Sequence, residues 1–377
     1  MNIRRRKTTA VPPVQESRPG PVDWWLLAII LLLLCVGLLA VLTASGPVSQ
    51  RLYGESYHFF RSQLMAMGLG GVVITIICLL PRKFINKLHY WGVGIAIVLI
   101  LASLFGPRIN GAHRWINLRF MMLQPMEFTR VALVMYLAYF LSTKQHMVQT
   151  FSRGLLPPTV VTGIICLLLY FQPDFGGIIL MLALFFFMCI AGGLRTKHLL
   201  CLIIPAAFAA VILIVIEPYR LARWTAYLEP FADKQGAGWQ IVQSLYALGS
   251  GGLFGVGIGA SRQKTGSLPE AHNDYIMSIV GEETGFFGIT IVMVLFALFF
   301  YRSYHVVLHQ KNLRDKLSAY GLTIIVALSF TISMAVILGL VPPKGIAMPF
   351  ISYGGSSLLS NMICAGLLLH YSRTSRE

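Results

Sequence analysis

The chain has 377 residues, of which 56% are hydrophobic and only 12% are charged. Soluble domains carry about 25% charged residues, so this composition excludes an ordinary soluble globular protein. The 30 Lys and Arg residues outnumber the 14 Asp and Glu residues, which gives a formal net charge of +16. Carboxylates are therefore scarce, and each one that stands in a polar segment is a candidate for chemistry.

Long apolar runs organise the sequence. A basic, proline-rich tail (residues 1–22) precedes the first run, residues 24–44, which contains no charge. A helix needs about 20 apolar residues to cross a bilayer, and this run is too long for a cleaved leader peptide, so we expect a retained anchor. Similar runs predict nine more spans, near residues 62–80, 91–105, 123–142, 155–171, 175–191, 199–216, 275–300, 317–341 and 350–371.

These runs are too long for the strands of a barrel, so the sequence predicts an all-α integral membrane protein, a bundle of about ten transmembrane helices. We expect one membrane domain (residues 23–372) between the tail at residues 1–22 and a short tail at residues 373–377. Of the 30 Lys and Arg residues, 18 fall on the side that carries both tails. Positive charge favours the cytoplasmic side, so both termini are expected there.

One large extracytoplasmic loop, residues 217–274, is the only long polar stretch after the first span. Within it, residues 237–249 carry apolar side chains at helical spacing, which predicts an amphipathic helix at the membrane interface. The loop ends in Asp274, at the first turn of the next predicted helix. Asp274 is our candidate general base, and the plain alternative is an N-cap. Asn273 offers a cap of its own, which frees Asp274.

Three other carboxylates fall within predicted spans. Glu282 and Glu283 follow Asp274 by eight and nine residues, about 12 Å deeper along a helix. They either hold helices together or orient the outer site. Glu127 and Arg130 share a helix face three residues apart, which predicts a structural ion pair.

Cationic side chains gather in the outer loops, although the positive-inside rule disfavours them there. A guanidinium group binds phosphate in a bidentate manner, so several of them near Asp274 indicate a diphosphate site. Contact with lipid headgroups is the alternative. The candidates are Arg108, Arg114, Arg220, Arg223, Arg262 and Lys344.

Two further patterns give weaker signals. Glycines recur between residues 249 and 259 without a preceding strand or a following Lys-Ser, so close backbone approach or a hinge explains them better than a nucleotide loop. Glu270, His272 and Asp274 offer ligands for a divalent cation such as Mg²⁺ or Mn²⁺, but their spacing matches no standard metal site.

Several strings occur in a recognisable order along the chain. They are Asn110-Gly111-Ala112-His113-Arg114-Trp115, Gln124-Pro125-Met126-Glu127, Gln172-Pro173-Asp174-Phe175-Gly176, Pro269-Glu270-Ala271-His272-Asn273-Asp274, Gly281-Glu282-Glu283-Thr284-Gly285 and Pro349-Phe350-Ile351-Ser352-Tyr353-Gly354-Gly355. In this order and on ten spans, residues 24–372 resemble the SEDS family (shape, elongation, division and sporulation). The tripeptide Pro343-Lys344-Gly345 resembles the division branch more than the elongation branch. Met126, Arg130, Ser333 and Pro343 depart from the family's usual residues.

The resemblance implies a peptidoglycan glycosyltransferase that polymerises lipid II at the outer face of the bacterial cytoplasmic membrane, during septal synthesis in cell division. It places the family's catalytic aspartate on Asp274. It also implies as partners the nascent glycan strand, a class B penicillin-binding transpeptidase and divisome regulators, and no nucleic acid. We expect a supporting polar network of Glu127, Arg130, Glu270, His272, Glu282, Glu283 and Ser352. The alternatives are a lipid II flippase and a polymerase for cell elongation.

Overall fold

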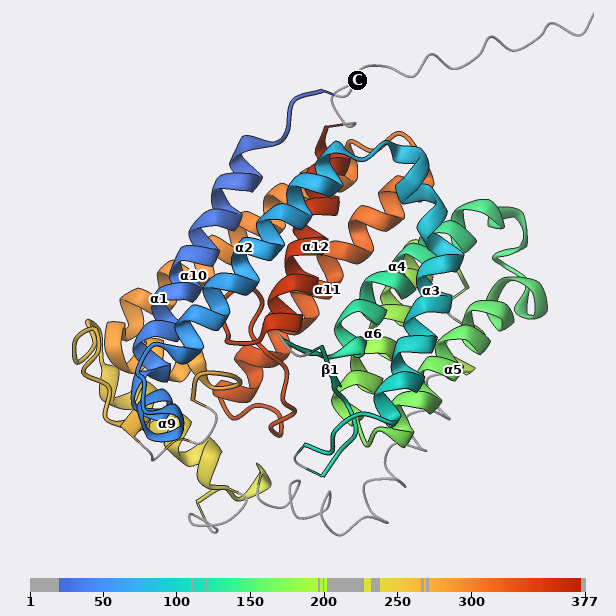
Figure 1. The fold of residues 1–377 in the computed structure, drawn as a ribbon. Helices are drawn as coiled ribbons and strands as arrows, with labels where there is room; N and C mark the ends of the chain where they lie inside the picture. The colour runs from blue at the N-terminus through green and yellow to red at the C-terminus, as the bar shows by residue number, and fades with distance from the viewer. Residues whose placement is uncertain are drawn as a thin grey trace, which may run out of the picture.

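The computed structural model describes residues 20–373, except residues 110, 119–120, 196, 199, 202–226, 232–237, 266–267 and 269–270. This part is almost entirely helical, as predicted (Figure 1). The first and last described residues meet, because the Gly20 amide donates to the Arg373 carbonyl at 2.9 Å. We call this end of the bundle the terminal end, and the opposite end, where Asp274 lies, the site end.

Helices of membrane-spanning length follow one another along the chain. The elements are α1 (Trp24–Tyr53), α2 (His58–Leu79), α3 (Arg82–Leu104), β1 (Ile116–Asn117), β2 (Met122–Leu123), α4 (Pro125–Thr143), η1 (Gln145–Met147), η2 (Phe151–Leu155), α5 (Leu156–Phe171), α6 (Phe175–Ala191), α9 (Trp239–Gly251), η3 (Gln263–Thr265), α10 (Ile276–Leu308), α11 (Leu313–Ile337) and α12 (Gly355–Ser372). Among the described helices, five are long and apolar enough to cross a membrane, and two shorter helices are apolar as well. The predicted span at residues 199–216 lies mostly outside the described residues.

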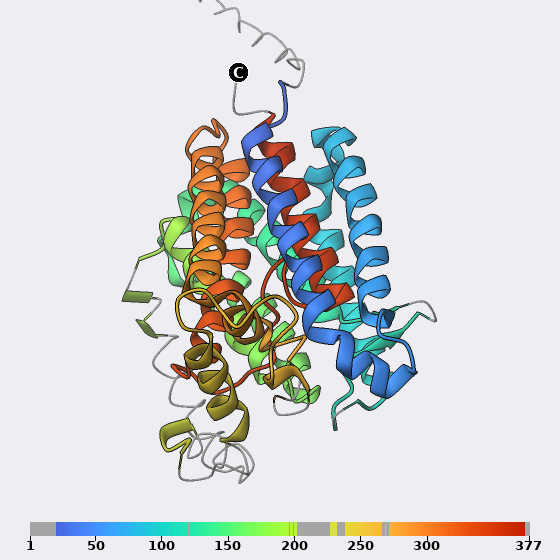
Figure 2. The same ribbon diagram turned by 90° about the vertical axis from the view of Figure 1, so that its left-hand side faces the viewer.

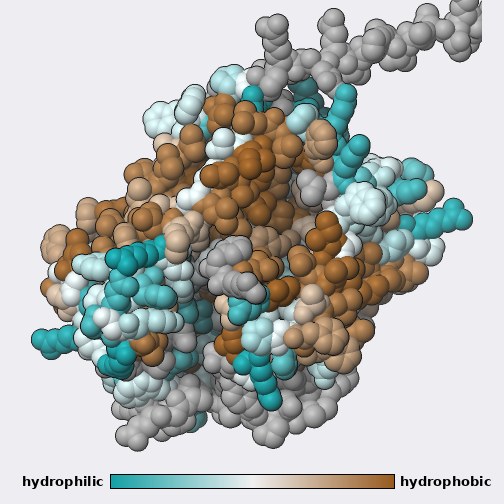
Figure 3. Space-filling model, in the orientation of Figure 1, coloured by the Kyte–Doolittle hydropathy of each residue, from teal (hydrophilic) through white to brown (hydrophobic). Residues whose placement is uncertain are grey.

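The helices form two groups that α11 joins (Figures 1 and 2). In one group α2 packs along α12, and α1 contacts both α2 and α10. In the other group α3 packs along α4, and α5 along α6, while α11 contacts α4, α6 and α10. A belt of hydrophobic surface crosses the helices in Figure 3, and hydrophilic side chains gather below it and at its upper right edge. This distribution is that of a multi-pass membrane protein.

Helix α10 is interrupted where the sequence predicted a continuous span. Gly285 has φ 69° and ψ −165°, which breaks the helix into two parts. Residues 252–259, which we call the glycine loop, fill the break. Its Val256 and Gly257 amides donate to the carbonyls of Glu282 and Glu283 at 2.9 and 3.1 Å. In return, the Phe286 and Phe287 amides donate to the Gly252 and Leu253 carbonyls at 2.9 and 3.1 Å. These are bonds that a continuous helix would have made within itself.

Glycine is required at this junction. A Cβ on Gly255 would lie 2.1 Å from the Glu283 carbonyl oxygen, and a Cβ on Gly285 would lie 2.4 Å from the Gly255 amide nitrogen. The prediction that the glycine-rich stretch serves close backbone approach is therefore confirmed.

The segment between α11 and α12, which we call the α11–α12 loop (residues 338–354), folds back into the bundle. Span 317–341 was expected to end later and span 350–371 to begin earlier than the helices do. The sequence could not distinguish this loop from a span, because its Phe350 and Ile351 are only 2% and 0% exposed. Gly37 of α1 makes room for it, since a Cβ there would lie 2.2 Å from the Phe350 carbonyl oxygen. Non-helical backbone at membrane depth is tolerated where protein surrounds it.

Candidate active site

Asp274 lies in a turn at the site end, immediately before α10. The helix begins at Ile276 with Tyr275 at the N-cap position, so Asp274 precedes the helix and does not lie in its first turn as predicted. The residue is partly exposed, whereas the neighbouring Ala271, His272 and Tyr275 are buried. This position leaves the Asp274 carboxylate at the surface of the site end, on a turn whose neighbouring residues are buried.

The α11–α12 loop fixes the backbone that carries Asp274. Its Ser352 hydroxyl donates to the Asn273 carbonyl at 2.6 Å, and its Tyr353 amide donates to the His272 carbonyl at 3.0 Å. Ser352 Oγ also accepts from the Met348 amide at 2.9 Å, which closes the loop on itself. Ser352 therefore fixes the backbone next to Asp274.

Gly345 brings the same loop close to the carboxylate. A Cβ built on Gly345 would lie 3.6 Å from Asp274 Oδ2, and its φ of +66° favours glycine. Lys344, the next residue, lies against the start of α6, where a Cβ on Gly176 would lie 2.9 Å from the Lys344 carbonyl oxygen. Lys344 is partly buried, and burial lowers the pKa of its ammonium group from the ordinary 10.5. A cationic residue thus stands one position from the glycine that borders Asp274.

His272 is held by aromatic stacking. Its ring lies 4.6 Å from the Phe59 ring at an interplanar angle of 30°, and Tyr353 packs on Phe59 at 4.9 Å. The residue is 7% exposed. This cluster joins α2 to the turn that carries Asp274.

Arg114 meets the loop between α5 and α6. Its Nε donates to the Gln172 carbonyl at 3.1 Å, its Nη2 donates to the Pro173 carbonyl, and its Nη1 lies 3.8 Å from Asp174 Oδ1. Asp174 in turn caps α6 by accepting from the Gly177 amide at 3.1 Å. Asp174 and the Lys344 backbone both lie at the start of α6, so the Arg114 and Lys344 segments flank the same helix terminus.

The remaining predicted cations are not drawn together by the described structure. Arg108 and Arg262 are exposed, and the Arg262 amide donates to Glu282 Oε1 at 3.0 Å. Two other predicted cations, Arg220 and Arg223, lie outside the described residues, and so does Glu270 of the predicted polar network.

Glu282 and Glu283 hold the chain that leads from the glycine loop to Asp274. Glu282 accepts from the Ser261 hydroxyl and from the amides of Arg262 and Gln263. Glu283 Oε1 pairs with Lys264 Nζ at 2.7 Å, and the same ammonium donates to the Gly259 carbonyl at 2.7 Å. Both carboxylates are almost fully buried. These contacts attach the loop to α10, whereas the sequence predicted that the two carboxylates either hold helices together or orient the outer site.

Glu127 and Arg130 form the structural ion pair that their spacing predicted. The pair is buried in α4, and Arg130 Nη1 also donates to Ser329 Oγ of α11 at 2.8 Å. Ser360 of α12 donates to the Glu127 carbonyl at 2.6 Å. The pair thus joins three helices inside the bundle.

Three residues of the site were not assigned a role from the sequence. Asp174 was quoted only within a motif, yet it joins Arg114 to α6. Lys264 was one of several loop cations, yet it is the buried partner of Glu283. Gly285 gave a weak signal, as a glycine two positions after Glu283 inside an apolar run.

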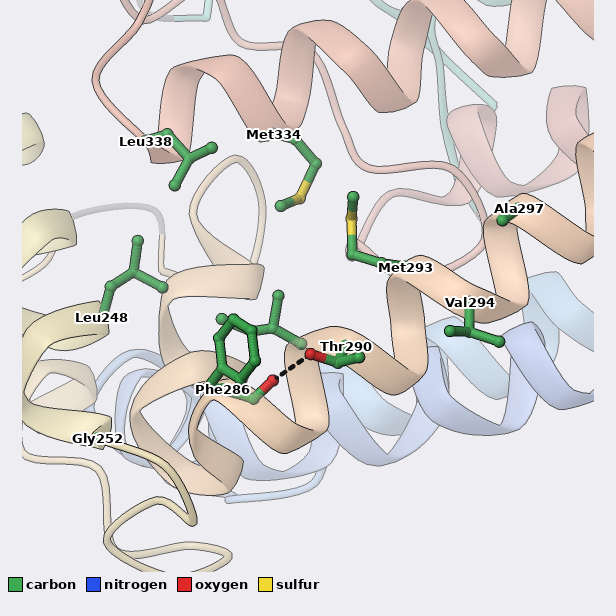
Figure 4. A pocket seen from close by; sticks show the side chains of 10 residues that line it. Leu248, Gly252, Phe286, Thr290, Met293, Val294, Ala297, Met334 and Leu338 are labelled. Atoms are coloured by element: carbon green, nitrogen blue, oxygen red, sulfur yellow. Dashed lines mark hydrogen bonds between the residues drawn. The ribbon is translucent and has the colours of Figure 1, made fainter.

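Two further observations concern ligands. Among the described residues, no group of three or more His, Cys, Asp or Glu side chains is placed to hold a metal ion. A largely apolar groove of about 710 Å³ runs between α9, α10 and α11 (Figure 4). Its lining includes Leu248 of α9, Phe286, Met293 and Val294 of α10, and Met334 of α11.

Comparison with known proteins gives matches over nearly the whole chain. Residues 23–377 match the family of cell cycle proteins whose label names FtsW, RodA and SpoVE. A probable peptidoglycan glycosyltransferase FtsW of Trichlorobacter lovleyi is 38% identical over 359 residues, which cover 94% of each chain. Stage V sporulation protein E of Bacillus subtilis is 36% identical over 365 residues, 94% of this chain and 98% of that protein.

Solved structures agree with these relatives. A chain from a structure titled as the coordination of polymerization and crosslinking by a peptidoglycan synthase complex superposes with a TM-score of 0.78, at 25% identity, over 94% of this chain and 99% of that chain. The rod shape determining protein RodA of Thermus thermophilus gives a TM-score of 0.71 at 25% identity, over 94% of this chain and 98% of that chain. The chain therefore belongs to the FtsW, RodA and SpoVE family of cell cycle proteins.

Proposed function

We propose that this protein is a peptidoglycan glycosyltransferase that polymerises lipid II into glycan strands, with Asp274 as the general base. The names of its relatives support this activity. The observation that carries the role of Asp274 is its placement: a partly exposed carboxylate on a turn that two hydrogen bonds fix, beside the loop that carries Lys344.

In the proposed reaction, Asp274 accepts the proton of the acceptor sugar's 4-hydroxyl group. The oxygen attacks the anomeric carbon of the lipid-linked donor, and the bond from that carbon to the diphosphate oxygen breaks. Undecaprenyl diphosphate leaves with the bonding electron pair, and the α linkage becomes β by a single inverting displacement. A diphosphate needs no protonating acid to leave, so one carboxylate suffices, unlike the two-carboxylate pattern of glycoside hydrolases.

Cationic groups stabilise the charge that develops on the diphosphate. Lys344 is the candidate beside Asp274, and Arg114 lies at the same terminus of α6. The N-terminus of a helix adds favourable backbone dipoles for an anion. The other outer arginines, Arg108, Arg220, Arg223 and Arg262, remain candidates for diphosphate contact, as does a divalent cation.

Replacement of Asp274 by Asn tests the proposed base. We expect polymerisation of purified lipid II in detergent to fall by roughly 10²–10⁴-fold, the contribution of a general base. The matched control is Glu55→Gln, which neutralises an exposed carboxylate at the same end of the bundle and should leave the rate unchanged. Wild-type activity in a folded Asp274→Asn protein would remove the proposed base.

The same relationship supports a proposal for the protein's place in the cell. We place it in the bacterial cytoplasmic membrane with both termini cytoplasmic, at the division septum, and as part of the division branch. Since Gly20 and Arg373 lie at one end, one orientation puts both tails on the same side. A protease added outside spheroplasts should cleave an engineered site in the outer loop and spare tags on both termini.

The partner we propose is a class B penicillin-binding transpeptidase with a single membrane span. A structural neighbour comes from a complex that polymerises and crosslinks, which supports such a pairing. The apolar groove is lined along α10 from Phe286 to Ala297 and by Met334 near the end of α11, so it suits a single apolar helix. A cysteine at Val294 should crosslink to cysteines in the partner's span, whereas one at Val72, on the exposed face of α2, should not.

The contacts favour an enzyme over a lipid II carrier. A carrier needs polar groups along a path through the bilayer. Here the charges of Glu127 and Arg130 pair with one another within α4, and the break in α10 is filled by the glycine loop. Liposomes that carry lipid II only in the outer leaflet separate the two functions, because polymer formation there requires no translocation.

A further inference from the structure

The glycine loop exposes apolar side chains that no other described segment covers. Leu253, Phe254 and Ile258 are 67%, 83% and 81% exposed, although the loop belongs to a segment that the sequence placed outside the membrane. Phe286 and Phe287 of α10, whose amides bond to this loop, are 65% and 61% exposed. On a loop surrounded by water, an apolar surface of this kind would promote aggregation, so the question is what surrounds it.

The depth of the loop follows from helix geometry. Arg302 of α10 pairs with Asp23 at the terminal end, and Trp24 and Trp25, 68% and 72% exposed, follow Asp23 directly. Exposed tryptophans beside a charged pair mark a membrane–water interface. Gly285, where the helix breaks, lies 17 residues from Arg302, about 25 Å along the unbroken part of α10, which is less than the roughly 30 Å thickness of the hydrocarbon core. The opposite hydrocarbon boundary therefore falls on the Asp274 side of Gly285.

The glycine loop lies at and below this boundary. Its residues 252–257 pair with residues 282–287 of α10, and the Leu253 carbonyl bonds to Phe287, the deepest partner. Phe287 lies 15 residues from Arg302 on the unbroken part of α10, about 22 Å from the terminal boundary, so this part of the loop reaches about 7 Å into a hydrocarbon core of roughly 30 Å.

The polar groups of the loop are arranged as lipid requires. Backbone groups in hydrocarbon need internal partners, and the break in α10 supplies them for the carbonyls of Gly252 and Leu253 and the amides of Val256 and Gly257. The charged contacts of Lys264, Glu282 and Glu283 face inward and are buried, while the apolar side chains face out.

From this geometry we infer that the glycine loop is a re-entrant element that inserts its apolar side chains among the acyl chains of the leaflet at the site end. The segment between α9 and Asp274 thus attaches the turn of the candidate base to the bilayer itself. This inference concerns the position of the loop and holds whether or not Asp274 is the base.

Fluorescence quenching in vesicles tests the inference. Two variants of the full chain, Phe254→Cys and Ile258→Cys, are made with every native cysteine removed. Each carries an environment-sensitive fluorophore on its single cysteine and is placed in vesicles of phosphatidylethanolamine and phosphatidylglycerol. The lipid reference is Cys35 kept alone, which is exposed within α1. The water reference is Thr265→Cys, exposed on the same segment. Thermal unfolding checks that each labelled protein is folded, and the two loop positions serve as independent measurements.

We expect nitroxide on the lipid acyl chains to quench positions 254 and 258 as it quenches Cys35, and aqueous iodide to quench only position 265. Iodide quenching at 254 and 258 equal to that at 265 would place the loop in water and overturn the inference. Protection from both quenchers would show that protein covers the loop, and would overturn it as well.

Discussion

The ion pair between Lys264 and Glu283 gives the sharpest quantitative test of how the chain before Asp274 is held. The two side chains are only 7% and 3% exposed, with Nζ 2.7 Å from Oε1. Lys264→Met leaves the Glu283 carboxylate buried without its counter-charge, next to Glu282. Removal of one member of a buried ion pair costs about 3–5 kcal/mol of unfolding free energy.

An exposed pair in the same chain supplies the control. Arg61 and Glu55 are 65% and 42% exposed, and exposed pairs contribute roughly 0–1 kcal/mol, so Arg61→Met should have little effect. Titration of the protein with SDS in mixed micelles, followed by tryptophan fluorescence, gives the unfolding free energies. Lys264→Met combined with Glu283→Gln should recover most of the loss, since no buried charge is left alone. If Lys264→Met costs no more than Arg61→Met, the buried attachment described here is wrong.

Three other substitutions test separate parts of the structure. Gly285→Ala should sharply reduce the yield of folded protein, because φ is 69° and a Cβ would lie 2.4 Å from backbone, whereas Gly71→Ala, with open space around it, should fold normally. Lys344→Arg should extend polymerisation activity to higher pH. Burial lowers the pKa of the lysine below 10.5, so Lys344 loses its charge at a lower pH than an exposed lysine does, whereas arginine keeps its charge. Ser352→Ala removes the hydrogen bond to the Asn273 carbonyl, so turnover should fall several-fold while unfolding free energy falls by only about 0.5–1.5 kcal/mol.

The sequence predicted the helices well because hydrophobicity determines them directly. The predicted span 175–191 coincides with α6, and most others differ only at their ends. The Glu127–Arg130 pair was predicted correctly for a similar reason, since both partners lie on one helix and spacing alone brings them together.

Contacts between distant segments were beyond the reach of this reasoning. Arg114 and Asp174 lie 60 positions apart, and only the packing of α3, α5 and α6 brings them together. Hydropathy also gave no sign that residues 350–354 form a buried loop, because a loop surrounded by protein is as apolar as a span. Asp274 could be singled out because carboxylates are rare in the chain and this one stands at a boundary, and its role as the base stays a prediction.

The interrupted helix explains why an enzyme in a membrane would keep such a costly arrangement of glycines and buried carboxylates. A continuous α10 would satisfy its own backbone and leave Asp274 on a turn joined to the bundle by that helix, by the α11–α12 loop and by the stack of His272 on Phe59. With the break at Gly285, the first part of α10 forms a unit with the glycine loop, which Glu282, Glu283 and Lys264 hold together. The position of Asp274 then depends on contacts on both of its sides along the chain. If the glycine loop moved in the bilayer, its hydrogen bonds to the first part of α10 would transmit the movement to Asp274. The terminal end of the helix would not need to move.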